Sequence, residues 1–257
     1  SQFNHTIVYS KTNEFVLKNL PRTEEDNKLY KNPDNDPRGK WRAGYCVNGL
    51  YRPNLKYDII TPNGNIIKSP EKGWRWSKET LEKKIQEGEI IYNADETAII
   101  HKLYLNDLDG KVPENIWTKG DAGTTRQATT ELKILFGGKA PFDTPKPTQL
   151  LERIIQIASD DKSIILDSFA GSGTTAHAVL NMNKSDGGNR KFILVEMGDY
   201  ADTITAERVK RVINGYGKGK NAVEGTGGNF SYYELGNSLF VQDGTINDEV
   251  DITEGKL

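Results

Sequence analysis

Asp167, Gly171, Gly173 and Glu196 are the residues of this sequence whose types and spacing point most directly to ligand chemistry. Three of them lie in LDSFAGSGTTAHAVL, residues 166–180, and Glu196 follows at the end of the next apolar run. The pattern predicts a buried strand, a tight glycine turn and a helix whose first N–H groups can meet a ligand. An acid at the end of the following strand can accept hydrogen bonds from ribose hydroxyls. These residues therefore predict a site for a nucleotide-like molecule.

The residues around the turn narrow the choice of ligand. A phosphate-binding P-loop needs a lysine after its last glycine, whereas Thr174 follows Gly173 here. The glycines also fit the G-x-G-x-x-A pattern of NAD-binding folds, but Asp167 would face a pyrophosphate unfavourably and a cationic amino acid group favourably. We therefore favour S-adenosylmethionine, which carries an ammonium group and ribose hydroxyls. Two structural interpretations stay open, a loop-bracing acid for Asp167 and a surface acid for Glu196.

The elements that must hold this turn can be predicted from the periodicity of the surrounding sequence. One-sided apolar patterns and continuous apolar runs predict helix, strand, helix, strand and helix, in that order, over residues 147–159, 163–171, 174–183, 191–196 and 201–215. This order is typical of a doubly wound α/β sheet, and the continuous apolar strands indicate a parallel sheet that is buried on both faces.

Composition sets the wider limits on the class of protein. The chain has 257 residues, of which 35% are hydrophobic and 27% charged, as in globular proteins. No run approaches 18 consecutive apolar residues, and the start resembles no secretion signal. With one cysteine and three histidines, neither an internal disulfide nor a zinc cluster is expected. We therefore expect a cytoplasmic protein with no metal site and no membrane segment.

A second candidate surface precedes the glycine turn. Residues 11–140 carry 22 Lys and Arg against 19 Asp and Glu, whereas the rest carries 12 against 17. Within it, residues 20–75 are rich in turn-forming residues, which predicts a loop-rich β region. Cations alternate with aromatic residues at Arg38, Trp41 and Arg42, and again at Arg75, which suits phosphate contact and base stacking. The alternative is that the tryptophans are core residues and the cations are solvated.

Several segments resemble known DNA methyltransferases. DSFAGSGTT (167–175) is similar to the cofactor motif of amino-methylating enzymes, although Ser168 stands where proline is frequent. TPKPTQLLERII (144–155) and FILVEMGDY (192–200) resemble the flanking motifs in the circularly permuted, beta-class order. NPDNDPRGKWR, AGTTRQATTELKILFG, RVKRVINGYG and GTGGNFSYYEL look like the modification subunit of type III restriction-modification systems, so the resemblance covers nearly the whole chain.

The resemblance implies a Rossmann-like, S-adenosylmethionine-dependent α/β fold with an inserted, mixed α+β target-recognition region. Its segments would be a core strand in 1–19, recognition in 20–140, cofactor binding in 141–236 and an acidic tail in 237–257. The implied cofactor residues are Lys146, Pro147, Asp167, Phe169, Ala170, Gly171, Ser172, Gly173, Thr174 and Glu196. The expected DNA-binding residues are Arg38, Trp41, Arg42, Arg75, Arg126 and Gln127, with the last two in a loop before a helix over 128–136. The implied partners are double-stranded DNA, a second copy of the full-length protein and a helicase-nuclease restriction subunit.

The family's catalytic element, a D/N/S-P-P-Y/F/W motif that holds the flipped base, does not occur in this sequence. None of its 10 prolines are adjacent. We therefore expect a C-terminal part of a longer adenine-N6 methyltransferase, with no catalytic residue here and no methyl transfer by this chain alone. The alternatives are a cytosine-N4 methyltransferase part, an NAD-dependent oxidoreductase and a non-catalytic DNA-binding protein.

Overall fold

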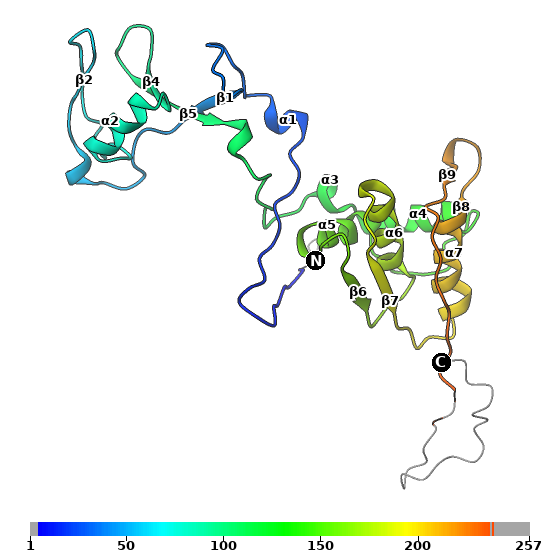
Figure 1. The fold of residues 1–257 in the computed structure, drawn as a ribbon. Helices are drawn as coiled ribbons and strands as arrows, with labels where there is room; N and C mark the ends of the chain where they lie inside the picture. The colour runs from blue at the N-terminus through cyan, green and yellow to red at the C-terminus, as the bar shows by residue number, and fades with distance from the viewer. Residues whose placement is uncertain (1–4, 237, 239–257) are drawn as a thin grey trace. The chain divides into compact units, whose positions relative to one another are not determined.

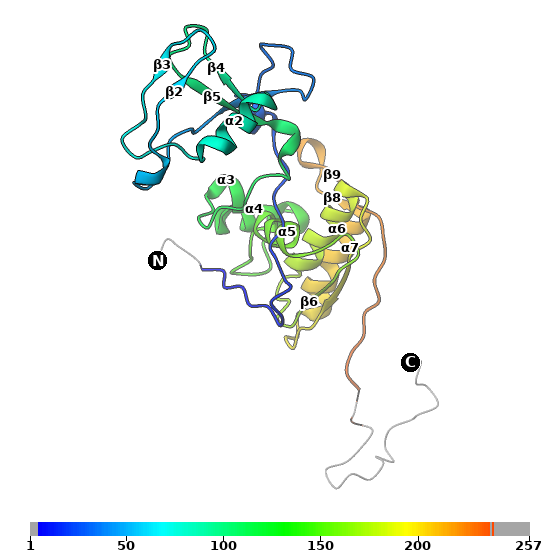
Figure 2. The same cartoon turned by 60° about the vertical axis from the view of Figure 1, so that its left-hand side comes forward.

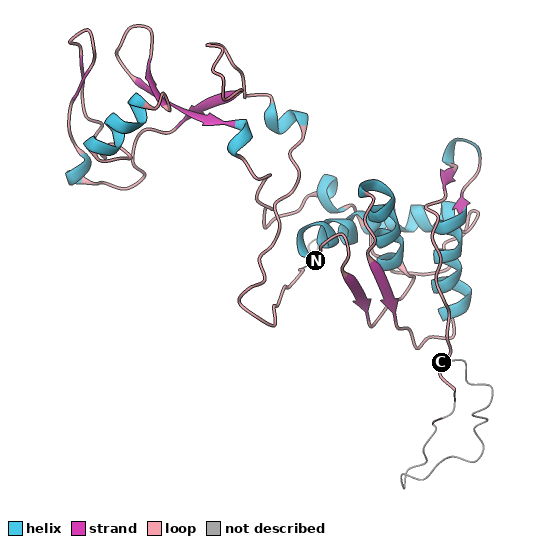
Figure 3. Ribbon diagram, viewed as in Figure 1, coloured by secondary structure: helices cyan, strands magenta, loops and turns pink. Residues whose placement is uncertain are grey.

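The computed structural model describes residues 5–236 and residue 238, and it divides the chain into two compact units. One unit is Asn19–Pro113, and the other combines residues up to Lys18 with those from Glu114 onward. Figures 1 and 2 show the two units from two sides, and Figure 3 shows their helices and strands. Among the described residues, no helix is both long enough and apolar enough to span a bilayer.

The Asn19–Pro113 unit is built on a small antiparallel sheet. Its central strand β5 (Ile99–Tyr104) pairs with β1 (Trp41–Gly44) on one side and β4 (Ile90–Tyr92) on the other. A separate hairpin joins β2 (Ile59–Ile60) to β3 (Ile66–Ile67). The remaining elements are helices α1 (Glu24–Asn27) and α2 (Lys78–Gln86) and the 3-10 turns Pro53–Leu55 and Leu105–Asp107.

The core of this unit lies between α2, the hairpin and the sheet. Leu81 of α2 and Ile90 of β4 are both 1% exposed and pack with Ile59, Ile67, Trp74 and Ile99. Ser77 caps α2 by accepting a hydrogen bond from the Thr80 N–H, which satisfies one of the helix's free donors. The predicted loop-rich β character of this region is thus confirmed.

The second unit contains a parallel strand pair with helices packed against it. Strands β6 (Ile164–Asp167) and β7 (Lys191–Leu194) run parallel, with Asp167 opposite Leu194. The helices are α3 (Lys119–Ala122), α4 (Thr125–Leu135), α5 (Thr148–Ala158), α6 (Thr174–Asp186) and α7 (Glu207–Asn214), and a π-helix over Ala201–Ala206 leads into α7. Strands β8 (Gly215–Tyr216) and β9 (Val223–Glu224) form a short hairpin, with a 3-10 turn at Gly219–Asn221.

Helices α5, α6 and α7 and one face of the β6–β7 pair form the core of this unit. Ala176, Ala178 and Val179 of α6 are fully buried between residues of α5, α7 and β7. Both views show α5, α6 and α7 side by side (Figures 1 and 2). The order helix, strand, helix, strand, helix predicted for 147–215 is therefore confirmed.

Three expectations from the sequence were wrong. The strands are not buried on both faces, because Ile164 and Leu166 of β6 are 65% and 63% exposed and no described residues cover that face. Residues 5–10 form no strand, because no described segment pairs with them. Arg126 lies in a helix instead of a loop, because Thr124 caps α4 by accepting a hydrogen bond from the Gln127 N–H.

The compact unit Asn19–Pro113 is shorter than the predicted recognition region 20–140, whose assignment stays a prediction. Residues 114–140, which the resemblance assigned to the recognition region, pack with the cofactor-motif unit. Residues 1–4 of the expected core strand and, apart from residue 238, the expected acidic tail lie outside the described residues.

Candidate cofactor site

The glycine turn lies between the end of β6 and the start of α6. The Ala170 N–H donates to the Val195 carbonyl over 3.0 Å, which fastens the turn to the strand segment beside it. Gly171 and Gly173 both have positive φ, at 53° and 77°, a conformation that side chains disfavour. A Cβ atom at Gly173 would in addition lie 3.0 Å from the Thr205 carbonyl oxygen. Both glycines are therefore required by the backbone path of the turn.

Glu196 contacts the turn directly. Its Oε2 accepts a 2.7 Å hydrogen bond from the Gly171 N–H, and its Oε1 accepts one of 2.9 Å from the Gly198 N–H. Burial raises the pKa of this carboxyl, but these two N–H groups and the Tyr200 hydroxyl outweigh it and hold the pKa below its ordinary value. The carboxyl is therefore held in its ionised form, which is the form that accepts hydrogen bonds from hydroxyl groups.

Asp167 lies at the end of β6 and has local partners. Its Oδ2 accepts a 2.5 Å hydrogen bond from the Thr175 hydroxyl, and its Oδ1 accepts one of 3.2 Å from the Phe169 N–H. Asp167 therefore braces the turn, as the structural interpretation required, and it still has free lone pairs. Phe169 beside it is 90% exposed, whereas Ala170 is buried.

The segment before α5 meets the turn from the other side. The Thr174 hydroxyl donates to the carbonyl oxygen of Lys146 over 3.4 Å, and the Lys146 side chain itself is exposed. Pro147 occupies the cap position of α5, where its fixed φ of −62° suits the start of a helix. Lys146 and Pro147 are thus brought to the glycine turn through the backbone.

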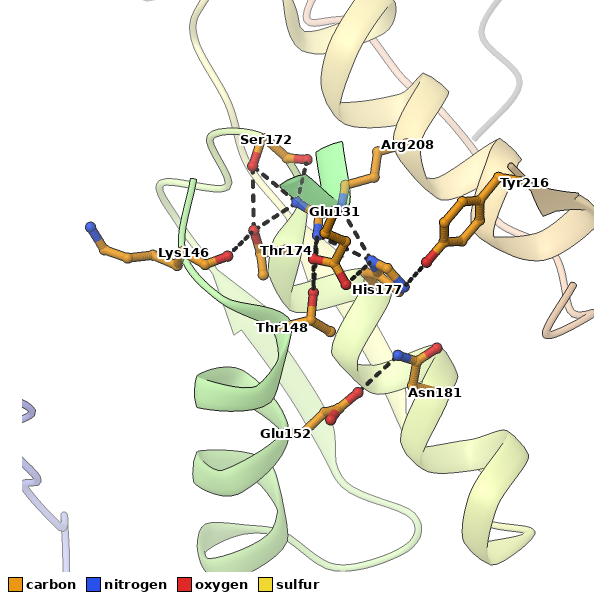
Figure 4. Close-up of polar contacts among 10 residues, drawn as sticks. All are labelled: Glu131, Lys146, Thr148, Glu152, Ser172, Thr174, His177, Asn181, Arg208 and Tyr216. Carbon is orange, nitrogen blue, oxygen red and sulfur yellow. Dashed lines mark hydrogen bonds and ion pairs between the residues drawn. The ribbon is translucent and has the colours of Figure 1, made fainter. Parts of the chain in front are cut away.

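A buried polar cluster supports the turn from within, and sequence reasoning missed it. Figure 4 shows the Arg208 side chain among Ser172, Thr174, His177 and Glu131. Arg208 is 0% exposed, and its partners come from other elements that are distant in sequence. Its position on the same face as Val212, one turn further along α7, was the only signal available.

The sequence that forms this turn and its surroundings matches a known protein family. A profile described as DNA methylase matches residues 1–207, which is most of the sequence. The chain belongs to the DNA methylase family. The match includes the turn at Gly171, Glu196 and the segment at Lys146.

Individual relatives of this chain are modification enzymes. The chain is 34% identical over 230 residues to the type III restriction-modification enzyme StyLTI Mod subunit of Salmonella typhimurium, which is 82% of this chain and 34% of that protein. It is 35% identical over 190 residues to the EcoP15I Mod subunit of Escherichia coli, or 73% of this chain and 28% of that protein. The type II methyltransferase M.KpnI of Klebsiella pneumoniae is 31% identical over 224 residues, or 76% of this chain and 50% of that protein. The chain thus spans about a third of the length of the type III relatives it matches.

Several of the expected DNA-binding residues have partners inside the Asn19–Pro113 unit. The Arg38 guanidinium binds the buried Asp36 carboxylate and the Gly88 carbonyl. Trp41 donates from its ring N–H to Asp34 over 2.9 Å, and Arg42 donates to the Tyr30 hydroxyl over 2.9 Å. These side chains therefore stabilise the loop and sheet that carry them.

Arg75 is different, because it is exposed and stacks near the Trp76 ring, 6.0 Å from its centroid. Arg52 and Lys56 are exposed as well, and none of the three makes an ion pair with the residues that the structure describes. Residues 52–56 and 72–75 lie side by side, because the Arg52 N–H donates to the Lys72 carbonyl and the Trp74 N–H donates to the Leu55 carbonyl. We call Arg52, Lys56 and Arg75 the free cation group.

Arg126 and Gln127 lie in the first turn of α4, in the cofactor-motif unit. Both are exposed, and both line a cleft of about 380 Å³ with Glu131, Tyr216 and Val223. The cleft places two polar side chains near the buried cluster around Arg208, since Glu131 belongs to both.

Proposed function

We propose that this chain is the S-adenosylmethionine-binding and DNA-recognition part of a type III modification subunit that methylates adenine at N6. The observation that carries the proposal is that Glu196 binds the Gly171 N–H of the glycine turn and Asp167 binds Phe169 and Thr175 on either side of it, within the segment that matches the DNA methylase family. The adenine specificity rests on the resemblance to type III modification subunits.

The residues of the turn fit this cofactor in chemistry. The carboxyl ends of β6 and β7 meet at one edge of their sheet because the strands are parallel neighbours, as in other α/β ligand sites. There, Glu196 would accept hydrogen bonds from ribose hydroxyls and Asp167 would attract the ammonium group. The cofactor would supply the methyl group on its sulfonium. Ser172, Thr174, Phe169 and the Lys146–Pro147 segment would enclose it, and β6 and β7 would belong to a larger Rossmann-like sheet.

For DNA recognition, we propose the compact unit Asn19–Pro113. Its support is the free cation group beside Tyr51 and Trp76, because Lys56 lies over the Tyr51 ring at 5.7 Å and Arg75 lies near the Trp76 ring. Cations beside aromatic rings suit phosphate contact and base stacking. Arg126 and Gln127 would be a second contact. Double-stranded DNA, a second copy of the full-length protein and a restriction subunit complete the proposed partners, in the cytoplasm.

A calorimetric titration tests the cofactor assignment. S-adenosylhomocysteine and S-adenosylmethionine should bind the chain, and NADH should not. The variant Asp167→Ala should lose about 1.5 to 3 kcal/mol of binding free energy, as expected for a hydrogen bond to a charged group. Asp160→Ala is the matched control, because Asp160 pairs with Lys18 and has no contact with the turn. Binding of NADH alone would overturn the proposal.

A further inference from the structure

Arg208 is a charged side chain in a place where charges are normally excluded. It is 0% exposed, and a buried cation without partners would cost several kcal/mol of stability. Burial indeed lowers the pKa of this guanidinium, and the Glu131 carboxylate opposes that effect. A buried guanidinium is stable only where its N–H groups have hydrogen-bond acceptors, so the partners of Arg208 indicate its role.

All three nitrogens of the guanidinium have acceptors. Nη1 donates to the Ser172 hydroxyl over 3.1 Å and to the Thr174 hydroxyl over 2.8 Å. Nη2 donates to Glu131 Oε2 and to the Thr148 hydroxyl, both over 3.1 Å. Nε donates to His177 Nδ1 over 3.3 Å (Figure 4).

The partner on α6 is a neutral histidine. Burial, and then the charge of Arg208, lowers the pKa of His177 to about 3. Arg208 has only donors, so His177 Nδ1 must carry the lone pair and its proton must be on Nε2, which lies 3.5 Å from the Tyr216 hydroxyl. Glu131 is thus the only charged partner of the guanidinium among the described residues, and it fixes the orientation of this planar group of N–H donors.

The partners of Arg208 come from both segments that would enclose the cofactor. Ser172 and Thr174 belong to the glycine turn, and Thr148 opens α5 directly after Lys146 and Pro147. Thr174 also donates to the Lys146 carbonyl, so the guanidinium, Thr174 and Lys146 form a continuous chain of hydrogen bonds. A single side chain on α7 therefore holds two walls of the proposed site at a fixed separation.

We propose that Arg208 is a positioning residue, which holds the Gly171–Thr174 turn and the Lys146–Thr148 segment in their binding geometry, with Glu131 of α4 holding Arg208. The proposal rests on the proposed cofactor function and deepens it. A hydrophobic residue could fill the same space, but it would leave the Glu131 carboxylate and the turn hydroxyls without their donor. Only the planar guanidinium, with its five donors, can serve Glu131 on one side and the turn hydroxyls on the other.

The test compares cofactor affinity and stability in matched variants of the 257-residue chain. Arg208→Met should weaken S-adenosylhomocysteine binding by at least about tenfold, because the turn loses a charged hydrogen-bond donor. Arg208→Lys should restore part of the affinity, since it keeps the charge but not the fork. Arg190→Met is the control, because Arg190 is also buried in this unit and contacts Asn183 and Asp186 instead of the turn.

The result expected is that both Met variants lose thermal stability but only Arg208→Met loses affinity. Glu131→Gln provides a second route should Arg208→Met not fold, because it keeps the shape of the side chain and removes only its charge. Unchanged affinity in Arg208→Met or, if that variant does not fold, in Glu131→Gln would overturn the proposal. So would an equal loss of affinity in Arg190→Met. Failure of the unaltered chain to bind the nucleoside would instead contradict the proposed function.

Discussion

At the scale of single residues, the burial of His177 predicts that the stability of the fold depends on pH. It is 1% exposed in the folded chain, with its pKa at about 3, below the ordinary value of 6.5. Between these values the unfolded chain binds a proton that the folded chain does not. The free energy of unfolding should therefore be largest above pH 6.5 and should fall as the pH decreases toward 3.

His177→Gln should remove this part of the pH dependence. The glutamine oxygen can still accept a hydrogen bond from Arg208, but it has no proton to bind in this range. Denaturant unfolding at a series of pH values should show the unaltered chain losing up to about 1.4 kcal/mol per pH unit more than the variant. Parallel pH profiles for the two proteins across this range would contradict the assignment of a neutral, buried imidazole.

Single residues also show where sequence reasoning succeeded and where it stopped. The glycine turn could be predicted because positive φ and a close backbone approach are local demands that Gly171 and Gly173 answer within a few residues. The contacts of Arg208 with Glu131 and Thr148 span 77 and 60 positions, and no local pattern encodes them. For the same reason, the sequence could not distinguish Arg38, which binds Asp36, from Arg75, which is free of ion pairs among the described residues.

At the scale of elements, α4 is the helix whose role changed most between sequence and structure. Thr124 caps it, so the sequence could predict a helix there, but the resemblance assigned it to the recognition region. In the structure, Leu135 packs with Val209 and Val212 of α7, and Glu131 binds Arg208. Periodicity identifies which face of a helix is apolar, but it does not identify the partner that the face will meet.

This packing predicts that cofactor binding lowers the rate of amide hydrogen exchange in α4. Addition of S-adenosylhomocysteine should slow amide hydrogen exchange in Thr125–Leu135 as well as in the first turn of α6, because Glu131, Arg208 and Thr174 connect them. The last turn of α6, whose neighbour is Arg190, serves as the internal control and should change less. Protection confined to the glycine turn, with α4 exchanging as before, would show that the hydrogen bonds do not couple the two helices.

At the scale of the whole molecule, charge is distributed differently from what the sequence segments indicated. The excess of cations over residues 11–140 nearly disappears within the compact unit Asn19–Pro113, which has 16 Lys and Arg against 15 Asp and Glu. Net charge therefore gives this unit little long-range attraction for DNA. Any phosphate contact must come from cations without an internal acidic partner, and the free cation group of Arg52, Lys56 and Arg75 meets that condition among the described residues.

The free cation group thus predicts the salt dependence of DNA binding. Replacing Arg52, Lys56 and Arg75 together by glutamine should weaken binding to duplex DNA, because fewer phosphates are then neutralised. The slope of log affinity against log salt should fall by about 0.9 for each phosphate that these side chains no longer neutralise. Fluorescence anisotropy of a labelled duplex between about 50 and 200 mM salt measures this slope.

The control for this prediction is the paired variant Arg38→Gln, Arg42→Gln, because these side chains bind Asp36 and Tyr30 inside the unit. It should lower the stability of the unit and leave the slope nearly unchanged, since Asp36 already neutralises the Arg38 charge and the half-buried Arg42 side chain is held against Tyr30. A slope reduced by the control and unchanged by the triple variant would move the DNA contact from the free cation group to the Arg38 loop.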